Sequence, residues 1–116
     1  MSDAHRPVSS PELSATEAHQ RVQQEGALLL DVREASEFDQ VRVPGAANIP
    51  LSELAARRGE LPPDRQVAVI CRSGNRSAMA VEYLRHFGID AINVAGGLIS
   101  WQAVELPLAT GRADVA

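Results

Sequence analysis

Cys71 is the residue of this sequence with the most evident chemistry, and it is the only cysteine in 116 residues. It follows the apolar run VAVI, residues 67–70, and precedes the polar segment RSGNRS, residues 72–77. A cysteine thiolate is a strong nucleophile, whereas one cysteine excludes an intrachain disulfide and a multi-cysteine zinc site. The position therefore indicates either a catalytic nucleophile or a small buried side chain at the end of a strand.

The segment after Cys71 favours the nucleophile, because its composition is typical of an anion-binding loop. Backbone N–H groups in a tight turn before a helix point into one concavity, and the helix dipole adds partial positive charge. Two arginines beside a buried thiol would carry a desolvation cost unless an anion met them. We therefore expect a pKa of Cys71 below the usual value of about 8.5. We expect substrate to be bound by Arg72, Ser73, Gly74, Asn75, Arg76 and Ser77.

A histidine base for Cys71 is not expected. His86 lies ten positions after Arg76, which is about 15 Å along one helix, while His5 lies in the N-terminal tail and His19 in another predicted helix. A papain-like pair of cysteine and histidine is therefore disfavoured, and the loop itself must activate the thiol. This interpretation requires a thiol that solvent can reach; a thiol facing inward and sealed would contradict it.

The elements expected around Cys71 alternate between strands and helices. Ser14 and Glu17 form a capping box, Gly26, Gly59 and Gly88 are helix stop signals, and the two glycines at 96–97 predict a turn into a short helix. Such alternation predicts an α/β domain with a mostly parallel sheet and helices on both faces, with Cys71 at the carboxyl end of a strand. The predicted strands are 27–32, 46–49, 66–71 and 92–95, and the longer predicted helices are 15–24, 52–58 and 76–87.

Composition narrows the function classes further. All 11 basic residues are arginines, so lysine-dependent Schiff-base and Walker-type phosphate sites are excluded. The net charge of -4 argues against nucleic-acid binding, and no apolar run reaches membrane-spanning length. We expect one cytoplasmic domain over residues 8–108, with a disordered tail at 1–7 and a flexible tail at 109–116.

Three blocks of the sequence resemble single-domain rhodaneses, the sulfurtransferases of the thiosulfate-using type. The blocks are LLLDVREASEFDQVRVPGAANIPL at 28–51, VAVICRSGNRSA at 67–78 and NVAGGLISWQAVELPL at 93–108. The resemblance implies a three-layer α/β fold in which Cys71 carries sulfur and the following loop cradles it. It implies no metal or organic cofactor.

The first block carries the remaining implied roles. Asp31 and Arg33 are expected to brace the neighbouring loops by a salt bridge or cap, without a catalytic duty, whereas Glu34 and Glu37 are expected to be solvated. Arg42 stands where the family often has histidine before Ile-Pro-Gly. This departure leaves the turn intact, and we expect it to alter loop polarity or a partner surface.

The resemblance implies a double displacement through a Cys71 persulfide. The sulfur donor would be a small anion such as thiosulfate, the acceptor cyanide or a thiol, and a sulfur-relay protein is a further candidate partner; neither nucleic acid nor membrane is expected. Two alternatives stay open. One is a non-enzymatic binding or regulatory module, whose usual sign, loss of the loop cysteine, is absent here. The other is a phosphatase-like or arsenate-reductase-like enzyme, in which five residues separate cysteine and arginine rather than the four between Cys71 and Arg76.

Overall fold

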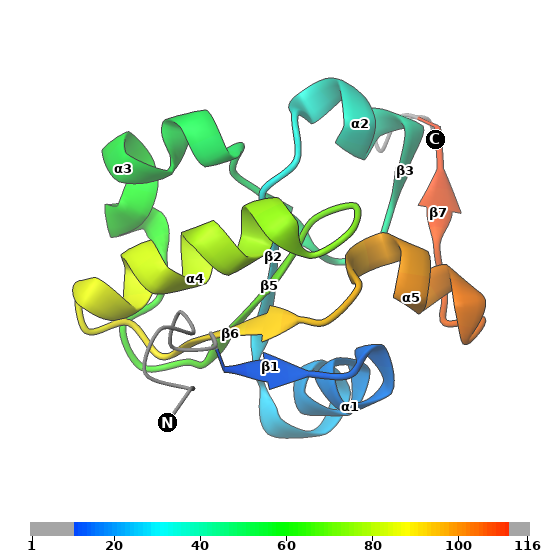
Figure 1. Cartoon of the computed structure of the whole chain (residues 1–116), viewed down its shortest axis with the longest axis horizontal. Helices are drawn as coiled ribbons and strands as arrows, with labels where there is room; N and C mark the ends of the chain where they lie inside the picture. The colour runs from blue at the N-terminus through cyan, green and yellow to red at the C-terminus, as the bar shows by residue number, and fades with distance from the viewer. Residues whose placement is uncertain (1–10, 112–116) are drawn as a thin grey trace, which may run out of the picture.

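A five-stranded parallel sheet forms the centre of the protein (Figure 1). The computed structural model describes residues 11–111. The strand order is β1-β6-β5-β2-β4, so β5 is the middle strand, and each neighbouring pair is parallel. The predicted α/β fold with a mostly parallel sheet is therefore confirmed. The strands are β1 (Glu12–Leu13), β2 (Leu28–Asp31), β4 (Ala47–Asn48), β5 (Val67–Ile70) and β6 (Ala91–Val94).

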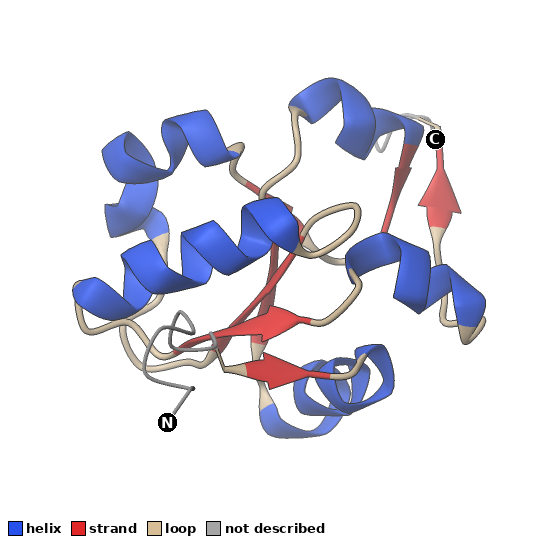
Figure 2. Ribbon diagram, in the orientation of Figure 1, coloured by secondary structure: helices blue, strands red, loops and turns tan. Residues whose placement is uncertain are grey.

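Helices cover both faces of this sheet, which gives three layers (Figures 1 and 2). One face carries α1 (Ala15–Glu25) and α5 (Gly97–Ala103), which pack on each other. The other face carries α4 (Asn75–His86) and α3 (Leu54–Arg57), and α2 (Ala35–Gln40) follows β2 beyond its carboxyl end. None of the helices within residues 11–111 is both long and apolar enough to cross a bilayer.

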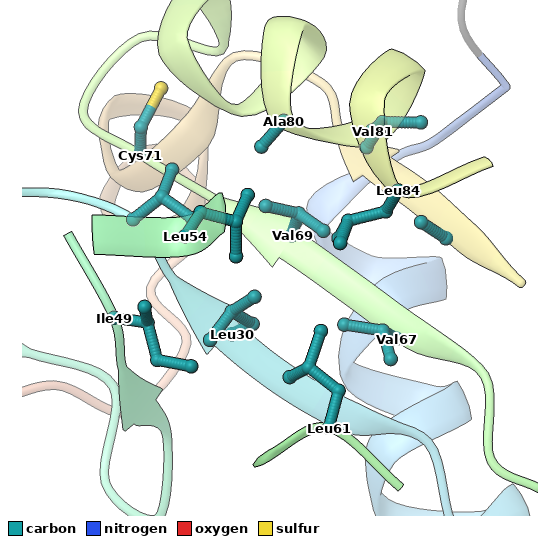
Figure 3. Close-up of a cluster of buried hydrophobic side chains, with 12 residues drawn as sticks. Leu30, Ile49, Leu54, Leu61, Val67, Val69, Cys71, Ala80, Val81 and Leu84 are labelled. Carbon is teal, nitrogen blue, oxygen red and sulfur yellow. The ribbon is translucent and has the colours of Figure 1, made fainter. Parts of the chain in front are cut away.

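The side chains of β5 alternate between two apolar clusters. Val67, Val69 and Cys71 belong to the cluster under α3 and α4 (Figure 3), whereas Ala68 and Ile70 belong to the cluster under α1 and α5. Every residue of β5 is fully buried. A parallel strand covered on both faces reads as a continuous apolar run, which is why the sequence signal for this strand is strong.

The helix signals at α1 act as predicted. The Ser14 hydroxyl accepts from the Glu17 N–H at 3.1 Å, the Glu17 carboxylate accepts from the Ser14 N–H at 2.9 Å, and Gly26 ends the helix with φ of 76°. The expected helix 52–58 is less regular. Two 3-10 turns, η2 (Leu51–Glu53) and η3 (Arg58–Glu60), flank the single turn of α3. Gly59 does not end it, because it lies inside η3 and lacks the positive φ of a glycine cap.

Four short elements have no counterpart in the sequence-based prediction. They are β1, α2, and the antiparallel pair formed by β3 (Val41–Arg42) and β7 (Ala109–Thr110). Two-residue strands carry too few positions to show a hydrophobic period. Strand β7 lies beyond residue 108, where the domain was expected to end, so paired structure continues to Thr110. The tail expected at 1–7 lies outside the described residues, as do residues 112–116 of the tail expected at 109–116.

Candidate active site

The loop after Cys71 joins the middle strand to α4, as the sequence predicts. Gly74 is the N-cap of α4 and has φ of 102°, a conformation that glycine adopts far more readily than other residues. A Cβ at Gly74 would also lie 3.2 Å from the Gly96 backbone nitrogen, so the position is tight. The turn therefore depends on glycine for both conformation and space.

Three donors surround the Cys71 sulfur. The backbone N–H groups of Gly74 and Ser77 donate to Sγ at 3.1 and 3.3 Å, and the buried Ser77 hydroxyl lies 3.3 Å away. Burial raises the pKa of Cys71, but the hydrogen bonds from the Ser77 hydroxyl and from the backbone of Ser77, Gly74 and Ser73 outweigh burial, so the pKa lies below its ordinary value. The direction matches the prediction, although hydrogen bonds rather than the loop arginines produce it.

The Cys71 side chain is only 1% exposed. Figure 3 shows its sulfur pointing away from the leucine and valine side chains of the cluster, so the thiol does not face the apolar interior. The expectation of a thiol that solvent reaches is nevertheless wrong for this conformation. The physical reason is geometric, because N–H groups that hydrogen-bond the sulfur from the loop also enclose it.

The two loop arginines differ in their partners. Arg76 donates to both carboxylate oxygens of Glu37, at 2.7 and 3.0 Å, so its charge is balanced. The expectation that Glu37 is merely solvated is therefore wrong. Its hydrogen bonds from Arg76 outweigh the effect of burial and, with the N–H of Glu34, lower its pKa to about 2. Arg72 is exposed, and its guanidinium forms no hydrogen bond or ion pair with residues 11–111.

Asp31 and Arg33 form a buried ion pair at the end of β2. The Arg33 side chain donates to Asp31 Oδ2 at 2.7 Å and to the Val41 carbonyl at 2.6 Å. The pair thereby links β2 to β3, the bracing arrangement that the resemblance implies. A buried ion pair is weak evidence that the fold is stabilised, but this pair fixes the position of β3 relative to β2.

A cavity of about 250 Å³ opens beside the loop, between α2 and α5. Arg72 is the one residue of segment 72–77 on its wall, and Cys71 is not on it. The walls combine charged, amide and aliphatic groups, which suits a small ligand with a polar and an apolar part. The lining residues are Arg33, Glu37, Gln40, Val41, Arg72, Leu98, Ile99, Gln102 and Leu108.

Gly97 positions the loop in a way that the sequence-based prediction missed, because it identified only a turn there. The Leu98 N–H donates to the Cys71 carbonyl at 2.8 Å and the Ile99 N–H to the Arg72 carbonyl at 3.1 Å. A Cβ on Gly97 would lie 2.3 Å from the Cys71 carbonyl oxygen. The first N–H groups of α5 therefore hold the backbone at Cys71 and Arg72, and only glycine allows this approach.

Asn93 is a second positioning residue that the prediction missed. It is buried in β6, and its Nδ2 donates to the Gly74 carbonyl at 3.3 Å and to Glu12 at 3.1 Å, while its Oδ1 has no partner within the described residues. An amide in the middle of the apolar strand AINV was the signal that could have revealed it, since a buried polar side chain needs hydrogen-bond partners.

Within residues 11–111, the side chains of the remaining predicted residues are not among the hydrogen-bond partners of the sulfur. Ser73 and Asn75 are exposed and contribute backbone to the loop. His19 packs edge-on against Trp101, in the cluster on the other face of the sheet, and His86 ends α4. As expected, neither His19 nor His86 lies where it could act as a general base for Cys71. His5 lies outside the described residues.

Arg42 is buried rather than part of a polar loop or an exposed surface. Its guanidinium donates to the carbonyls of Phe38 and Asp39 at 3.3 and 3.2 Å, at the end of α2, and to the carbonyl of Gly111. Arginine therefore caps α2 here and attaches β7 to it, because a cation is favourable at the negative end of a helix.

Comparison with known proteins identifies relatives over most of the described residues. The family model of the rhodanese-like domain matches residues 14–104. A sulfurtransferase of Allochromatium vinosum is 39% identical over 72% of this chain and 79% of its own. The putative sulfur carrier protein YrkF of Bacillus subtilis is 38% identical over 80% of this chain, which spans about half (51%) of that relative.

Solved structures agree with these relatives. A rhodanese-related protein from Thermoplasma volcanium superposes with a TM-score of 0.80 at 35% identity, covering 85% of this chain and 97% of that one. A thiosulfate sulfurtransferase from Pseudomonas aeruginosa superposes with a TM-score of 0.82 at 30% identity, covering 95% of this chain but 22% of its own.

Proposed function

Because this chain belongs to the rhodanese-like domain family, we propose that it is a sulfurtransferase that carries sulfane sulfur on Cys71. The observation that carries the proposal is the ring of donors around Sγ, formed by two backbone N–H groups and the Ser77 hydroxyl. Donors that favour a thiolate also favour the negatively charged outer sulfur of a persulfide. Relatives named as a sulfurtransferase and a sulfur carrier support the same reaction class.

The reaction proceeds by double displacement. The Cys71 thiolate attacks the outer sulfur of thiosulfate, a new S–S bond forms, the original S–S bond breaks, and sulfite leaves with the bonding electron pair. Cyanide or a thiol then attacks the outer sulfur of the Cys71 persulfide, and the thiolate is released. Two-step transfer through a covalent intermediate predicts ping-pong kinetics. A sulfur-relay protein remains a candidate acceptor, and the cytoplasm remains the expected compartment.

The proposal includes a movement that uncovers Cys71, because a side chain 1% exposed cannot meet a donor in this conformation. Arg72, Ser73 and Asn75 are exposed, so the segment that covers the sulfur lies at the molecular surface. Movements of surface loops take roughly nanoseconds to microseconds, which is short compared with a typical turnover of milliseconds or longer. The burial of the thiol is therefore compatible with catalysis only through an open form of this loop.

Phosphatase-like chemistry has less support. The loop arginine that would hold a phosphoryl group is Arg76, and both of its terminal amino groups, Nη1 and Nη2, donate to Glu37. Four rather than five residues separate it from Cys71. Turnover of an aryl phosphate without sulfur transfer would reverse this ranking.

Intact mass after incubation with thiosulfate tests the proposal. We expect the protein to gain the mass of one sulfur atom and to lose it on treatment with a reducing thiol. The Cys71→Ser variant should show neither the gain nor thiosulfate-to-cyanide transfer while unfolding at a similar denaturant concentration. Transfer retained by this variant would place the sulfur carrier elsewhere.

A further inference from the structure

The outer side of α4 carries a line of apolar side chains that stays exposed within the described residues. Met79, Tyr83 and Phe87 follow one another at intervals of four residues, so they lie on one side of the helix; we call them the α4 stripe. Met79 is 63% and Phe87 48% exposed, and the ring centroids of Tyr83 and Phe87 lie 5.0 Å apart. Large apolar side chains gathered in this way mark an interaction surface, whereas scattered ones do not.

Arg58, in η3, borders the stripe on one side. Its guanidinium lies 3.7 Å from the centroid of the Phe87 ring and donates to the Tyr83 hydroxyl. A cation over the face of a ring is attracted by the ring quadrupole. Arg58 has no carboxylate partner among the described residues, whereas its neighbour Arg57 is paired with Glu60. The stripe therefore has beside it a positioned cation that is available to a negative group.

Glu82 lies on the opposite side of the stripe. Successive residues of an α-helix are turned by about 100°, which places Glu82 about 100° to one side of Tyr83 and Phe87 about 40° to the other. The Glu82 carboxylate is exposed and forms no hydrogen bond or ion pair within residues 11–111. Arg85, on the next turn, instead donates to the Ala91 carbonyl at 2.9 Å. An unpaired anion and an unpaired cation thus flank the apolar line.

This arrangement is complementary to itself. A two-fold axis that passes through Tyr83 at right angles to α4 reverses the direction of the helix and exchanges its two flanks. The stripe of one copy then lies against the stripe of the other, with Met79 opposite Phe87 of the second copy. By the same rotation, Glu82 faces Arg58 of the second copy. A two-fold dimer requires a patch of this kind, because the same surface meets itself.

We propose that the outer face of α4 is the interface of a homodimer, in which two copies of α4 pack antiparallel across the stripe and two ion pairs between Glu82 and Arg58 join the copies. One helix face offers less than the roughly 800 Å² per partner of a stable interface, so we expect a weak dimer with a dissociation constant on the order of 100 µM. No residue of α4 lines the cavity beside the loop. The interface and the proposed sulfur site therefore use different surfaces, and the inference does not depend on the proposed function.

Sedimentation equilibrium of the full chain, from about 10 µM to about 1 mM, measures the dissociation constant. We expect the average mass to rise with concentration from that of the monomer toward that of the dimer. Met79→Gln changes the most exposed position of the stripe and should raise the dissociation constant about tenfold, because each dimer loses two apolar contacts. A monomer at every concentration, or an unchanged constant in Met79→Gln, would overturn the inference.

Charge reversal tests the pairing between copies. Glu82→Arg and Arg58→Glu each place like charges opposite one another, so each variant alone should dimerise about tenfold more weakly than the natural chain. An equimolar mixture of the two variants should associate about as strongly as the natural chain, because each charge then meets its opposite across the interface. Mixing can restore only those pairs that form between copies.

Glu25→Arg is the matched control, since it makes the same change in net charge as Glu82→Arg but lies in α1, on the other face of the sheet (Figure 1). It should dimerise like the natural chain to within about twofold, because solvent and salt screen a distant charge. A mixture that fails to associate, or equal weakening by Glu25→Arg, would contradict the inference. If Arg58→Glu does not fold, Glu82→Arg is compared with Glu25→Arg alone, and equal dissociation constants would refute the α4 interface.

Discussion

At the scale of single residues, the chemistry of Cys71 depends on hydrogen bonds more than on charge. Burial by itself would favour the neutral thiol, and the donors from Gly74 and Ser77 reverse that preference. The positive side chains act farther out, since Arg76 is directed to Glu37 and Arg72 to the cavity. In the proposed reaction, activation of the sulfur and attraction of the donor therefore belong to different groups.

This division predicts the effect of removing one donor. Ser77→Ala should raise the pKa of Cys71 by about one pH unit, because a hydrogen bond to a charged group is worth about 1.5 kcal/mol or more. The pH dependence of Cys71 alkylation by iodoacetamide, followed by intact mass, measures this shift. Below the pKa of the variant, its alkylation should be slower than that of the natural protein.

Ser73→Ala is the matched control, since the Ser73 side chain is exposed and only its backbone acts on the thiolate. Its alkylation profile should coincide with that of the natural protein. An unchanged midpoint in Ser77→Ala would show that the backbone donors alone set the pKa.

At the scale of elements, the loop is held between α5 and β6. The backbone N–H groups of Leu98 and Ile99, in the first turn of α5, donate to the carbonyls of Cys71 and Arg72. The side chain of Asn93, which lies in β6, donates to the Gly74 carbonyl. Fixed carbonyls orient the peptide planes of the loop, and so also the N–H groups that donate to the sulfur. An element far along the sequence from Cys71 thereby determines the geometry around it.

Gly97→Ala tests this arrangement. The added Cβ would lie 2.3 Å from the Cys71 carbonyl oxygen, and the alanine would have to adopt the positive φ of 57° that the glycine has. We expect a loss of about 3 kcal/mol in the free energy of unfolding, the sum of backbone strain and overpacking. Denaturant unfolding measures the loss, and sulfur transfer should fall as well.

Gly45→Ala separates the two causes. Gly45 has a positive φ of 84°, but no atom lies within 4 Å of its added Cβ. The Gly45→Ala variant should lose about 1 kcal/mol in the free energy of unfolding, because only the backbone conformation is unfavourable there. Equal losses in the two variants would mean that the contact between α5 and the loop contributes nothing.

At the scale of the whole molecule, the sheet and its two helical layers are completed by a contact between distant parts of the chain. Strand β7 pairs with β3 through Val41 and Thr110, and Arg42 reaches the Gly111 carbonyl. Leu108, which lines the cavity, directly precedes β7. The last described residues therefore hold one wall of the site.

Truncation tests where the domain ends. Ending the chain after Leu108 removes β7 and leaves Arg42 without its bond to Gly111, so we expect a loss of about 2 kcal/mol in the free energy of unfolding. Ending it after Gly111 should cost less than about 0.5 kcal/mol, because every described contact is kept. Equal stability of the two truncated chains would show that the β3–β7 pair contributes nothing.

Local signals were readable in the sequence because their partners lie within a few positions. The capping box joins Ser14 to Glu17, the buried run of β5 is continuous, and Gly74 must turn the chain between Cys71 and α4. The middle strand, the helix after it and the position of Cys71 at their junction were therefore predicted correctly. The two-residue strands β1, β3 and β7 and the six-residue helix α2 were missed, since such short elements show no period.

The sequence by itself determined the alternation of the longer strands and helices and the place of Cys71. It also determined the direction in which the pKa of Cys71 shifts, because backbone N–H groups at a strand-to-helix turn act over short distances. Only the tertiary structure decided that Arg76 pairs with Glu37, 39 positions away, that Arg42 reaches Gly111, 69 positions away, and that the sulfur is enclosed. These outcomes depend on how packed layers bring distant segments together, and no pattern within one segment contains that information.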